Sequence, residues 1–421
     1  MTARRLLAIS WDMPPLSGPR AVQVSRTLNQ LVPLGWESSV VCFGARSNRY
    51  NQDRALATAL EARGVTRLQV PSLEERFAFR ALWRLVPPLK NMPDEKWVWI
   101  RPAVRAARSA ASERRFDVLA SFAQPWSDHL IGLKLHRILG LPWVAHFSDP
   151  WVDSPYPPYS TAPAWQRRLW QRMEADIVRE ADALIFVTRQ TADRVMRKYP
   201  DAWRTKVSVV PHGHQGGARA IEEKKSPSHS LRSPLRIVHT GRFYEGRRTP
   251  EPLLRALGRL ASARPLAKEL KVVFVGTIVP AYVDLARALA LDDVVEFTGR
   301  VPHDESAALA AGADVLLVID APSDNSLFLP SKLIEYLPLH KPILGLTPAP
   351  GATADVLNEL AYPMAPPDDE RAIQSALEGM LERAATGTLA PSAQHDAVAR
   401  RYDIACTARA FHDVLMQCVR Q

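Results

Sequence analysis

The sequence of 421 residues has few cysteines and no long apolar run. Its three cysteines, Cys42, Cys406 and Cys418, show neither metal-ligand nor disulfide spacing, which is typical of a reducing compartment. No run approaches the ~20 apolar residues that a membrane-spanning helix needs. The apolar run that follows Arg5 is too short for the core of a signal peptide. We therefore expect a cytoplasmic protein.

Three other kinds of signal are also missing. No repeat of solenoid length is present, and no signature of a nucleic-acid-binding fold accompanies the basic charge. An Asp-x-Asp pair that could hold a divalent ion on a diphosphate does not occur in a suitable loop. We therefore expect no metal site, no cofactor and no nucleic-acid partner.

The positive charge lies almost entirely in the first half of the chain. Residues 1–210 hold 31 Lys and Arg against 19 Asp and Glu, a balance of +12, whereas the remainder holds 23 against 25, a balance of −2. A basic half indicates an anionic partner, such as an anionic lipid or a phosphorylated substrate. The two halves therefore have different partners.

Apolar runs alternate with helical patterns along the whole chain. The first run, 5–10, leads through a proline-rich loop to a helix over 21–34 and a strand over 38–43, which is a βαβ opening. The alternation starts again at Leu235, after a stretch over 213–234 that is rich in Gly, Ser, Pro and charge. The pattern predicts two doubly wound α/β domains joined by a linker.

One stretch combines a strand end, a polar loop and a helix start. The apolar run 313–319 is followed by the loop 320–330 and by a helix from Ser331. Ligands of open parallel sheets bind outside the carboxyl ends of the strands. Lys332 lies at the N-terminal end of the helix, where the helix dipole disfavours a positive charge, so a bound anion is favoured there. Glu335 lies on the same face of the helix. The alternative is a solvated surface ion pair.

The residues Leu329 to Leu337, with Lys341 to Leu344 after them, resemble the donor-site signature of the GT-B glycosyltransferases of group 1, family four. In that family the glutamate that matches Glu335 holds the nucleotide ribose. The first glutamate of the family's E-x7-E pattern falls at Leu327 and is missing here, as in many members with P-S-K-L-x-E-Y. The departure leaves the contacts to the donor sugar open.

The resemblance implies a fold and domain boundaries. The fold is α/β, with two doubly wound Rossmann-like domains facing across a cleft and a C-terminal helix that crosses back to the first domain. Residues 1–212 form the acceptor-binding domain, 213–234 the linker and 235–399 the nucleotide-sugar domain. Residues 400–421 form the returning helix.

The resemblance also assigns donor contacts in the second domain. Arg242 matches the family's diphosphate-binding arginine, and Arg247, Arg248 or Lys332 replaces its lysine; the alternative is a solvated basic loop. Gly299 and Val301 match the turn whose backbone lies beside the base. The loop whose backbone amides approach the diphosphate comprises Asn325, Ser326, Leu327, Phe328 and Leu329.

In the first domain the candidate catalytic residues are Asp149, His129 and His146. Gly18 and Arg20 lie where the family has a glycine-rich loop near the donor phosphate and acceptor, but a second glycine is absent and a surface turn is the alternative. Asp149 matches a turn that faces the donor sugar in related enzymes. His146 lies inside a predicted strand, where a histidine is more often a core residue, and His129 lies one turn into a helix.

The resemblance implies a retaining glycosyltransferase of the hexosyltransferase class, which we expect to be independent of metal ions. A nucleotide sugar is the donor substrate, and a saccharide or lipid-linked hydroxyl in cell-surface polysaccharide or glycolipid assembly is the acceptor. The alternatives are a nucleotide-sugar 2-epimerase and a non-catalytic nucleotide-sugar-binding protein.

The composition of residues 76–115 predicts that the protein lies peripherally on the inner face of the cell membrane. It holds ten basic residues against three acidic ones. Arg76, Arg80 and Arg84 recur along one side of a predicted helix, and apolar residues gather on another side. Such a helix can lie on an anionic membrane surface. The alternative is that its apolar side packs onto the domain core.

Overall fold

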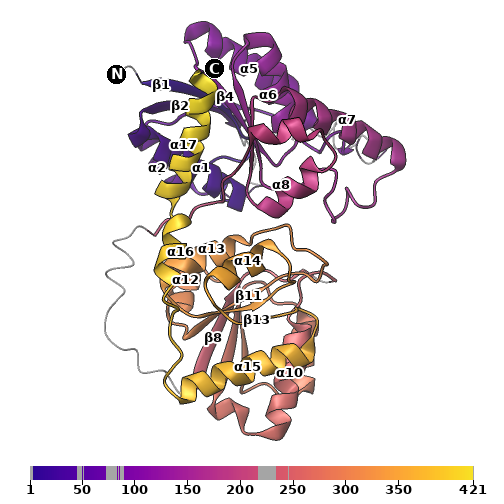
Figure 1. Ribbon diagram of the computed structural model, residues 1–421, viewed down its shortest axis with the longest axis vertical. Helices are drawn as coiled ribbons and strands as arrows, with labels where there is room; N and C mark the ends of the chain where they lie inside the picture. The colour runs from indigo at the N-terminus through magenta and orange to yellow at the C-terminus, as the bar shows by residue number, and fades with distance from the viewer. Residues whose placement is uncertain are drawn as a thin grey trace. The chain divides into compact units, whose positions relative to one another are not determined.

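The computed structural model of the chain describes residues 3–44, 50, 52–72, 83, 85, 90–216, 234–244 and 246–420 (Figure 1). It divides into two compact units: Met1–Gly213 with Ile404–Gln421, here called unit 1, and His214–Asp403, called unit 2. The expected linker and the basic helix expected over 76–86 lie largely outside the described residues. Within the described part of the chain, no helix is both long and apolar enough to cross a membrane.

Unit 1 contains a seven-stranded parallel sheet in the order β3-β2-β1-β4-β5-β6-β7. Its strands are β1 Arg4–Ile9, β2 Trp36–Phe43, β3 Thr66–Val70, β4 Val118–Ala123, β5 Trp143–Phe147, β6 Ala183–Phe186 and β7 Val207–Val209. Successive side chains of a strand point to opposite faces, so both faces of a central strand are buried. Leu7 and Ile9 enter one hydrophobic cluster, and Leu6 and Ala8 enter another.

Two helical layers cover the sheet of unit 1 (Figure 1). One face carries α5 Ile100–Glu113, α6 Ser127–Leu139, α7 Ala164–Glu180 and α8 Arg189–Met196. The other carries α1 Pro19–Leu31, α2 Arg54–Ala62 and α17 Ile404–Arg420. Short 3-10 turns are η1 Val32–Leu34, η3 Trp97–Trp99 and η4 Asp201–Lys206. Helix α1 shows why such elements end: Pro33 removes a backbone donor, and Gly35 then takes a left-handed φ of 87°.

Unit 2 contains a six-stranded parallel sheet in the order β10-β9-β8-β11-β12-β13. Its strands are β8 Leu235–Thr240, β9 Leu270–Val275, β10 Val295–Gly299, β11 Val315–Ile319, β12 Ile343–Leu346 and β13 Met364–Ala365. On one face lie α10 Glu251–Ala263, α11 Pro280–Ala288 and α15 Glu370–Ala385, with η5 Leu266–Lys268. On the other lie α13 Ser331–Tyr336, α14 Ala352–Glu359 and α16 His395–Arg401, with α12 His303–Ala311 and η6 Leu337–Leu339.

The C-terminal segment returns to unit 1, as expected, but not as one helix from Arg400. The chain breaks at Tyr402 and Asp403, between α16 and α17. Helix α17 packs against α1, and its Phe411 ring stacks 5.6 Å from the ring of Phe122 on β4. The buried side of α17 therefore completes the core of unit 1.

Candidate functional site

In unit 2 the strand order changes direction between β8 and β11. Strands β9 and β10 follow on one side of this point, and β12 and β13 follow on the other. The loops that leave β8 and β11 therefore diverge, and in open parallel sheets ligands bind in the crevice at this switch point. The residues singled out in the sequence at 242–248 and 320–335 belong to these two loops and to α13.

The loop after β8 is a tight turn that directs one of its three arginines inward. Its turn is closed by hydrogen bonds from the Tyr244 amide to the Arg248 carbonyl at 2.9 Å and from the Arg247 amide to the Tyr244 carbonyl at 3.0 Å. Arg242 and Arg247 are exposed, whereas Arg248 is half-buried, with its guanidinium 5.5 Å from the centroid of the Tyr244 ring. The loop thus presents a cation–π pair beside two exposed arginines.

The charge of Arg248 reaches the end of β11. Burial raises the pKa of Asp320, and hydrogen bonds from threonine hydroxyls and the positive charge of Arg248 oppose that rise. Burial likewise lowers the pKa of His239 to about 4, and the charges of Arg248 and Lys332 contribute to the decrease. The charge of Arg248, one of the cations that the sequence left open for this role, therefore acts on groups at the switch point.

Helix α13 places Lys332 and Glu335 on one face, as their spacing predicts. The Lys332 Nζ lies 2.8 Å from the Glu335 Oε2, and both side chains keep about a third of their surface exposed, at 32% and 33%. The ion pair proposed as the alternative to a ligand site is thus formed, but both groups remain accessible. A ligand with hydroxyl and phosphate groups can compete for both partners.

Tyr336 fixes this helix to the end of β8. Its hydroxyl oxygen accepts a 2.8 Å hydrogen bond from the Thr240 amide and lies 3.0 Å from the Thr240 Oγ1. The ring is buried, with 2% of its surface exposed. Tyr336 therefore fixes the face of α13 that carries Lys332 and Glu335 relative to the loop after β8. Sequence reasoning missed this role because the hydrogen bond spans 96 positions.

The loop 325–329 is packed rather than open. Asn325 is exposed and Phe328 and Leu329 are half-buried, but Ser326 and Leu327 are buried. A Cβ on Gly351 would lie 2.8 Å from the Ser326 Cβ, so only glycine allows this approach. Leu327, at the position of the family's first glutamate, is 7% exposed. The Leu327 side chain is therefore packed inside unit 2.

Three glycine turns meet beyond β8, β9 and β10. A Cβ on Gly276 would lie only 2.0 Å from the Gly241 carbonyl oxygen, and the Gly276 amide donates to the Gly299 carbonyl at 3.1 Å. Gly299 has a left-handed φ of 78°. Ile278, 45% exposed, lies 3.6 Å from the position of a Cβ on Gly299. Val301, two residues further on, is half-buried. The turn therefore offers bare backbone beside an exposed apolar side chain.

In unit 1 the strand order changes direction between β1 and β4. Arg20, at the start of α1, reaches this point. Its Nη2 donates to the Ala123 carbonyl and lies 3.2 Å from the His146 Nδ1. Its Nε and Nη1 have no hydrogen-bond partner among the described residues. Burial lowers the pKa of Arg20 to about 10, so it stays charged near neutral pH. Gly18, two residues earlier, has open space around its Cα.

Asp149 lies next to this arginine, in the turn after β5. Its Oδ2 accepts hydrogen bonds from the Gln124 Nε2 at 3.0 Å and from the Ser148 Oγ at 3.1 Å. Burial raises the pKa of Asp149, and the Ser148 hydrogen bond and the charge of Arg20 oppose that rise. The structure thus brings Arg20, Gln124 and Asp149 together. Gln124 was missed, although its place directly after β4 is the signal that could have found it.

The two candidate histidines lie at different depths. His146 is 5% exposed, and burial, with Arg20 next, lowers its pKa well below the usual value. The neutral ring can then accept from Arg20. His129 is fully buried, with Nδ1 2.8 Å from the Ser121 Oγ and its ring 4.4 Å from Phe147. The structure places His129 in the core, where burial lowers its pKa to about 3.

Across the described ranges of the chain, no group of three or more His, Cys, Asp or Glu side chains is arranged to hold a metal ion.

Comparisons with known proteins divide the chain in the same place as the fold. A family model described as "Glycosyl transferase 4-like domain" matches residues 20–213, and one described as "Glycosyl transferases group 1" matches residues 234–383. A comparison with curated protein sequences finds no match.

Several solved structures share the fold along the full length. A glycosyltransferase from Rickettsia africae ESF-5 is 12% identical, with a TM-score of 0.66 and 100% of both chains covered. The lipopolysaccharide outer core galactosyltransferase WaaB is 15% identical, with a TM-score of 0.64, covering 98% of this chain and 99% of WaaB. A putative UDP-N-acetylglucosamine 2-epimerase from Listeria monocytogenes is 11% identical, with a TM-score of 0.57 and coverage of 99% and 96%. At these identities the likeness shows the fold alone, which is GT-B.

Proposed function

This chain belongs to the group 1 glycosyltransferases, and we propose that it moves a glycosyl unit from a nucleotide-diphosphate sugar to an acceptor hydroxyl with retention of configuration. The observation that carries the proposal is the gathering of Arg248, Lys332 and Glu335 at the switch point of unit 2. Two cations and one accessible carboxylate suit a diphosphate joined to a ribose.

The donor contacts follow from the chemistry of these groups. Glu335 would accept hydrogen bonds from ribose hydroxyls, and Lys332, freed from its ion pair, would turn to the diphosphate. Arg248 and Arg242 would hold further phosphate oxygens, because a planar guanidinium matches them with paired donors. The bare backbone at Gly299, with Ile278 beside it, would accept the flat base.

Catalysis would depend on stabilising the departing diphosphate. Negative charge develops on the leaving group in the transition state, and cations fixed in advance lower the energy of that charge. Lys332 and the arginines of the β8 loop would supply this stabilisation, assisted by amides of the loop 325–329. No metal ion or cofactor is required in this scheme.

In unit 1 we assign Asp149 a contact to the donor sugar or to the acceptor, without giving it the role of nucleophile. Its carboxylate is held by Gln124 and Ser148, so its direction is fixed. The Nε and Nη1 of Arg20, which have no partner among the described residues, would bind an anionic or hydroxyl oxygen of the substrate. His146 would orient Arg20. His129 has no part in the proposal, because it lies in the core.

The acceptor that we propose is a saccharide or a lipid-linked sugar of surface polysaccharide or glycolipid assembly, met at the inner face of the cell membrane. The excess of +12 over residues 1–210 supports an acceptor or a surface that carries negative charge. The rest of the chain has a net charge of −2, which fits a unit that binds its anionic ligand through a few positioned cations.

Two experiments test the proposal in sequence. A screen of nucleotide sugars by melting temperature should find a donor, because a ligand at ~100 times its dissociation constant adds ~2.7 kcal/mol to stability. The selected donor is then incubated with the protein over hours, with and without candidate acceptors. Release of the nucleoside diphosphate supports a transferase, and its acceleration by an acceptor identifies the acceptor class.

Other outcomes point to the alternatives. An epimerised sugar found as the accumulating product would favour the 2-epimerase. Binding without any turnover would favour a nucleotide-sugar-binding protein, for which Leu327 at the glutamate position is the supporting feature. The absence of any stabilising nucleotide sugar would refute the donor site itself.

A further inference from the structure

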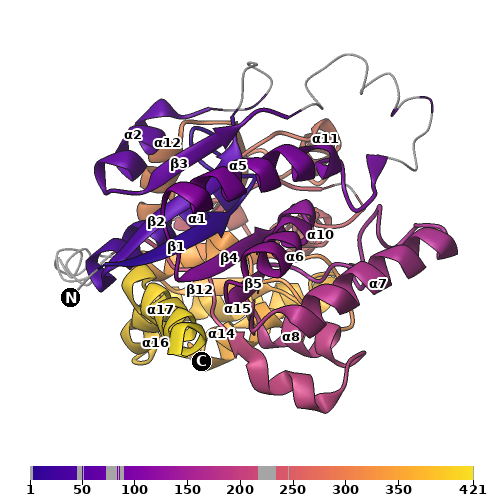
Figure 2. The same ribbon diagram turned by 90° about the horizontal axis from the view of Figure 1, so that it is seen from above.

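Helices α5, α6 and α7 form a continuous outer layer on one face of unit 1. Figure 2 shows the three helices in succession, and α6 contacts both α5 and α7. Their buried sides enter the same hydrophobic cluster, through Ala103 and Ala107 of α5, Ile131 of α6 and Trp170 of α7. Their opposite sides therefore form one solvent-facing surface, here called the basic face.

The basic face carries nine exposed cations that form no ion pair within the described part of the chain. They lie on the three helices and on the turn that follows α5, and they are Arg101, Arg105, Arg108, Arg114, Arg115, Lys134, Arg167, Arg168 and Arg172. The one exposed acid among them without a partner is Glu113. Folding leaves these positive charges uncompensated, which costs stability unless a partner uses them.

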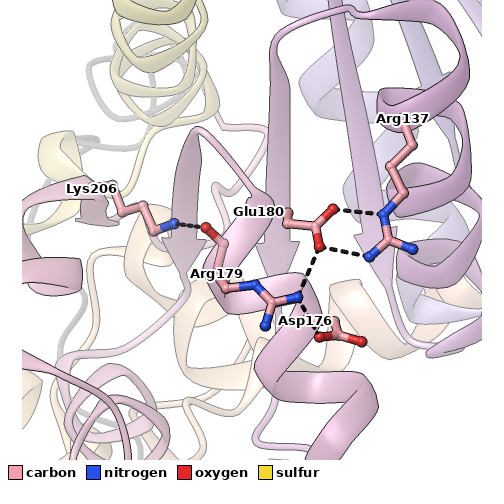
Figure 3. Close-up of polar contacts among 5 residues, drawn as sticks. All are labelled: Arg137, Asp176, Arg179, Glu180 and Lys206. Atoms are coloured by element: carbon pink, nitrogen blue, oxygen red, sulfur yellow. Dashed lines mark hydrogen bonds and ion pairs between the residues drawn. The ribbon is translucent and has the colours of Figure 1, made fainter.

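The C-terminal ends of α6 and α7 show the opposite arrangement (Figure 3). There Glu180 accepts from Arg137 at 2.6 and 2.7 Å and from Arg179 at 3.0 Å, and Arg179 also donates to Asp176 at 2.7 Å. Lys206 donates to the Arg179 carbonyl at 2.8 Å. Glu180 and Asp176 are therefore paired with arginines near these helix ends, and the unpaired positive charge lies on the rest of the surface.

Two exposed apolar side chains accompany the cations. Trp165, at the start of α7, has 50% of its surface exposed, and Ile138, at the end of α6, also has 50%. Arg168 and Arg172 follow Trp165 by three and seven residues, so the indole and both guanidinium groups lie on the same side of α7. An indole flanked by arginines is the side-chain set of an interfacial helix.

We propose that the basic face binds the surface of an anionic lipid bilayer, with Trp165 inserted at headgroup depth. Anionic headgroups are complementary to these nine unpaired cations on the three helices and the turn after α5, and the effect of each cation near such a leaflet is additive. A lipid surface also explains the exposed indole, which a sugar-phosphate backbone would leave in water. Arg76, Arg80 and Arg84 lie outside the described residues and are not needed for this surface.

The proposal deepens the membrane location proposed for this enzyme, but its evidence is the exposure, the charge and the lack of ion pairs among the described residues, so it is independent of the donor assignment. It assigns the interaction to α5, α6 and α7, whereas the donor contacts lie in unit 2. Loss of membrane binding should therefore leave nucleotide-sugar binding unchanged, and failure of one assignment does not decide the other.

The test is flotation of the full-length protein with vesicles of phosphatidylcholine and phosphatidylglycerol, beside vesicles of phosphatidylcholine alone. We expect binding only to the mixed vesicles and a decrease as salt is raised. Each cation near an anionic leaflet contributes a factor of about five, so Arg168→Glu with Arg172→Glu should weaken partitioning at least about 25-fold. Trp165→Ser should weaken binding even at raised salt, because its contribution is not electrostatic.

A matched control uses the other face of unit 1. Arg54 and Arg63 on and beside α2 are also exposed and without an ion pair among the described residues, and α2 buries Leu60 in the other cluster. Arg54→Glu with Arg63→Glu changes the net charge equally and should leave vesicle binding within about twofold of the wild type, because electrostatic attraction falls off within a Debye length. Unchanged melting temperatures verify that all variants fold.

Three results would overturn the proposal. The first is no flotation with the mixed vesicles at low salt. The second is an equal loss of binding in the α2 control, which would mean that net charge alone acts. The third is tighter binding to duplex DNA than to the mixed vesicles, with no effect of Trp165→Ser on either, which would identify a phosphate-backbone surface instead.

Discussion

Glu335 allows the donor site to be tested with little risk to the fold. Its ion pair with Lys332 is about one-third exposed, and exposed pairs contribute ~0–1 kcal/mol to stability. Glu335→Gln or Glu335→Ala should therefore shift the melting temperature only slightly. A large destabilisation would mean that the carboxylate has a structural role that its exposure does not reveal.

The effect on binding should be much larger than the effect on stability. A hydrogen bond to a charged group contributes ~1.5–3 kcal/mol, so either change should weaken the affinity for the nucleoside diphosphate roughly tenfold to a hundredfold. Isothermal titration calorimetry with the nucleotide selected in the screen measures this directly. Asp284→Ala is the matched control, because Asp284 forms an i,i+3 pair with Arg287 at 3.1 Å on α11 of the same unit.

A double-mutant cycle with Lys332→Met separates the two partners. If Lys332 turns to the diphosphate when Glu335 accepts the ribose, the two losses of binding energy should add within ~0.5 kcal/mol, as for independent contacts. If they bind only as a pair, the double variant should be no weaker than either single one. Unchanged affinity in both Glu335 variants, or an equal loss in Asp284→Ala, would refute the assigned donor site.

Three further predictions follow from single residues. Asp149→Asn keeps the shape and removes the charge, so turnover should fall far more than donor affinity; wild-type turnover would leave Asp149 as a turn residue. Tyr336→Phe leaves the buried Thr240 amide without its acceptor and should cost ~1–3 kcal/mol in urea denaturation; no loss would show that another group satisfies this amide. Hydrogen bonds from Arg137, then Arg179, lower the pKa of Glu180 to about 2, so its stabilising effect is present above its ordinary value and is lost as pH falls toward about 2. Glu180→Gln should thus cost about 1 kcal/mol near neutral pH and progressively less below about pH 4 in thermal melts, and a constant difference would contradict the shift.

Much of the fold is encoded locally and could be predicted. The apolar runs at 5–10, 235–239 and 313–319 became β1, β8 and β11, because a central parallel strand is buried on both faces and reads as a continuous apolar segment. The first helix was expected over 21–34; α1 ends at Leu31, and a 3-10 turn with Pro33 leads to the left-handed Gly35. The C-terminal break at Tyr402 was not foreseen, since both sides of it have helical patterns and no proline or glycine separates them.

The donor half of the site was also visible in the sequence. Lys332 and Glu335 lie three residues apart in one helix, and helix geometry alone places them on one face. The choice between Arg247 and Arg248 could not be made in this way. It depends on which side chain a tight turn directs toward the end of β11, and that direction is set by the hydrogen bonds around Tyr244.

In unit 1, only the tertiary structure decided which candidate residues are enclosed in the core and which of them contact one another. His129 on α6 and His146 on β5 are both buried, yet His129 is enclosed in the core while His146 contacts Arg20, 126 positions away. Gln124 reaches Asp149 because β4 and β5 are neighbours in the sheet. Sequence periodicity determines which residues share a face of an element, since it reflects backbone geometry. Which elements become neighbours depends on burial summed over the whole chain, and no single stretch of sequence contains that information.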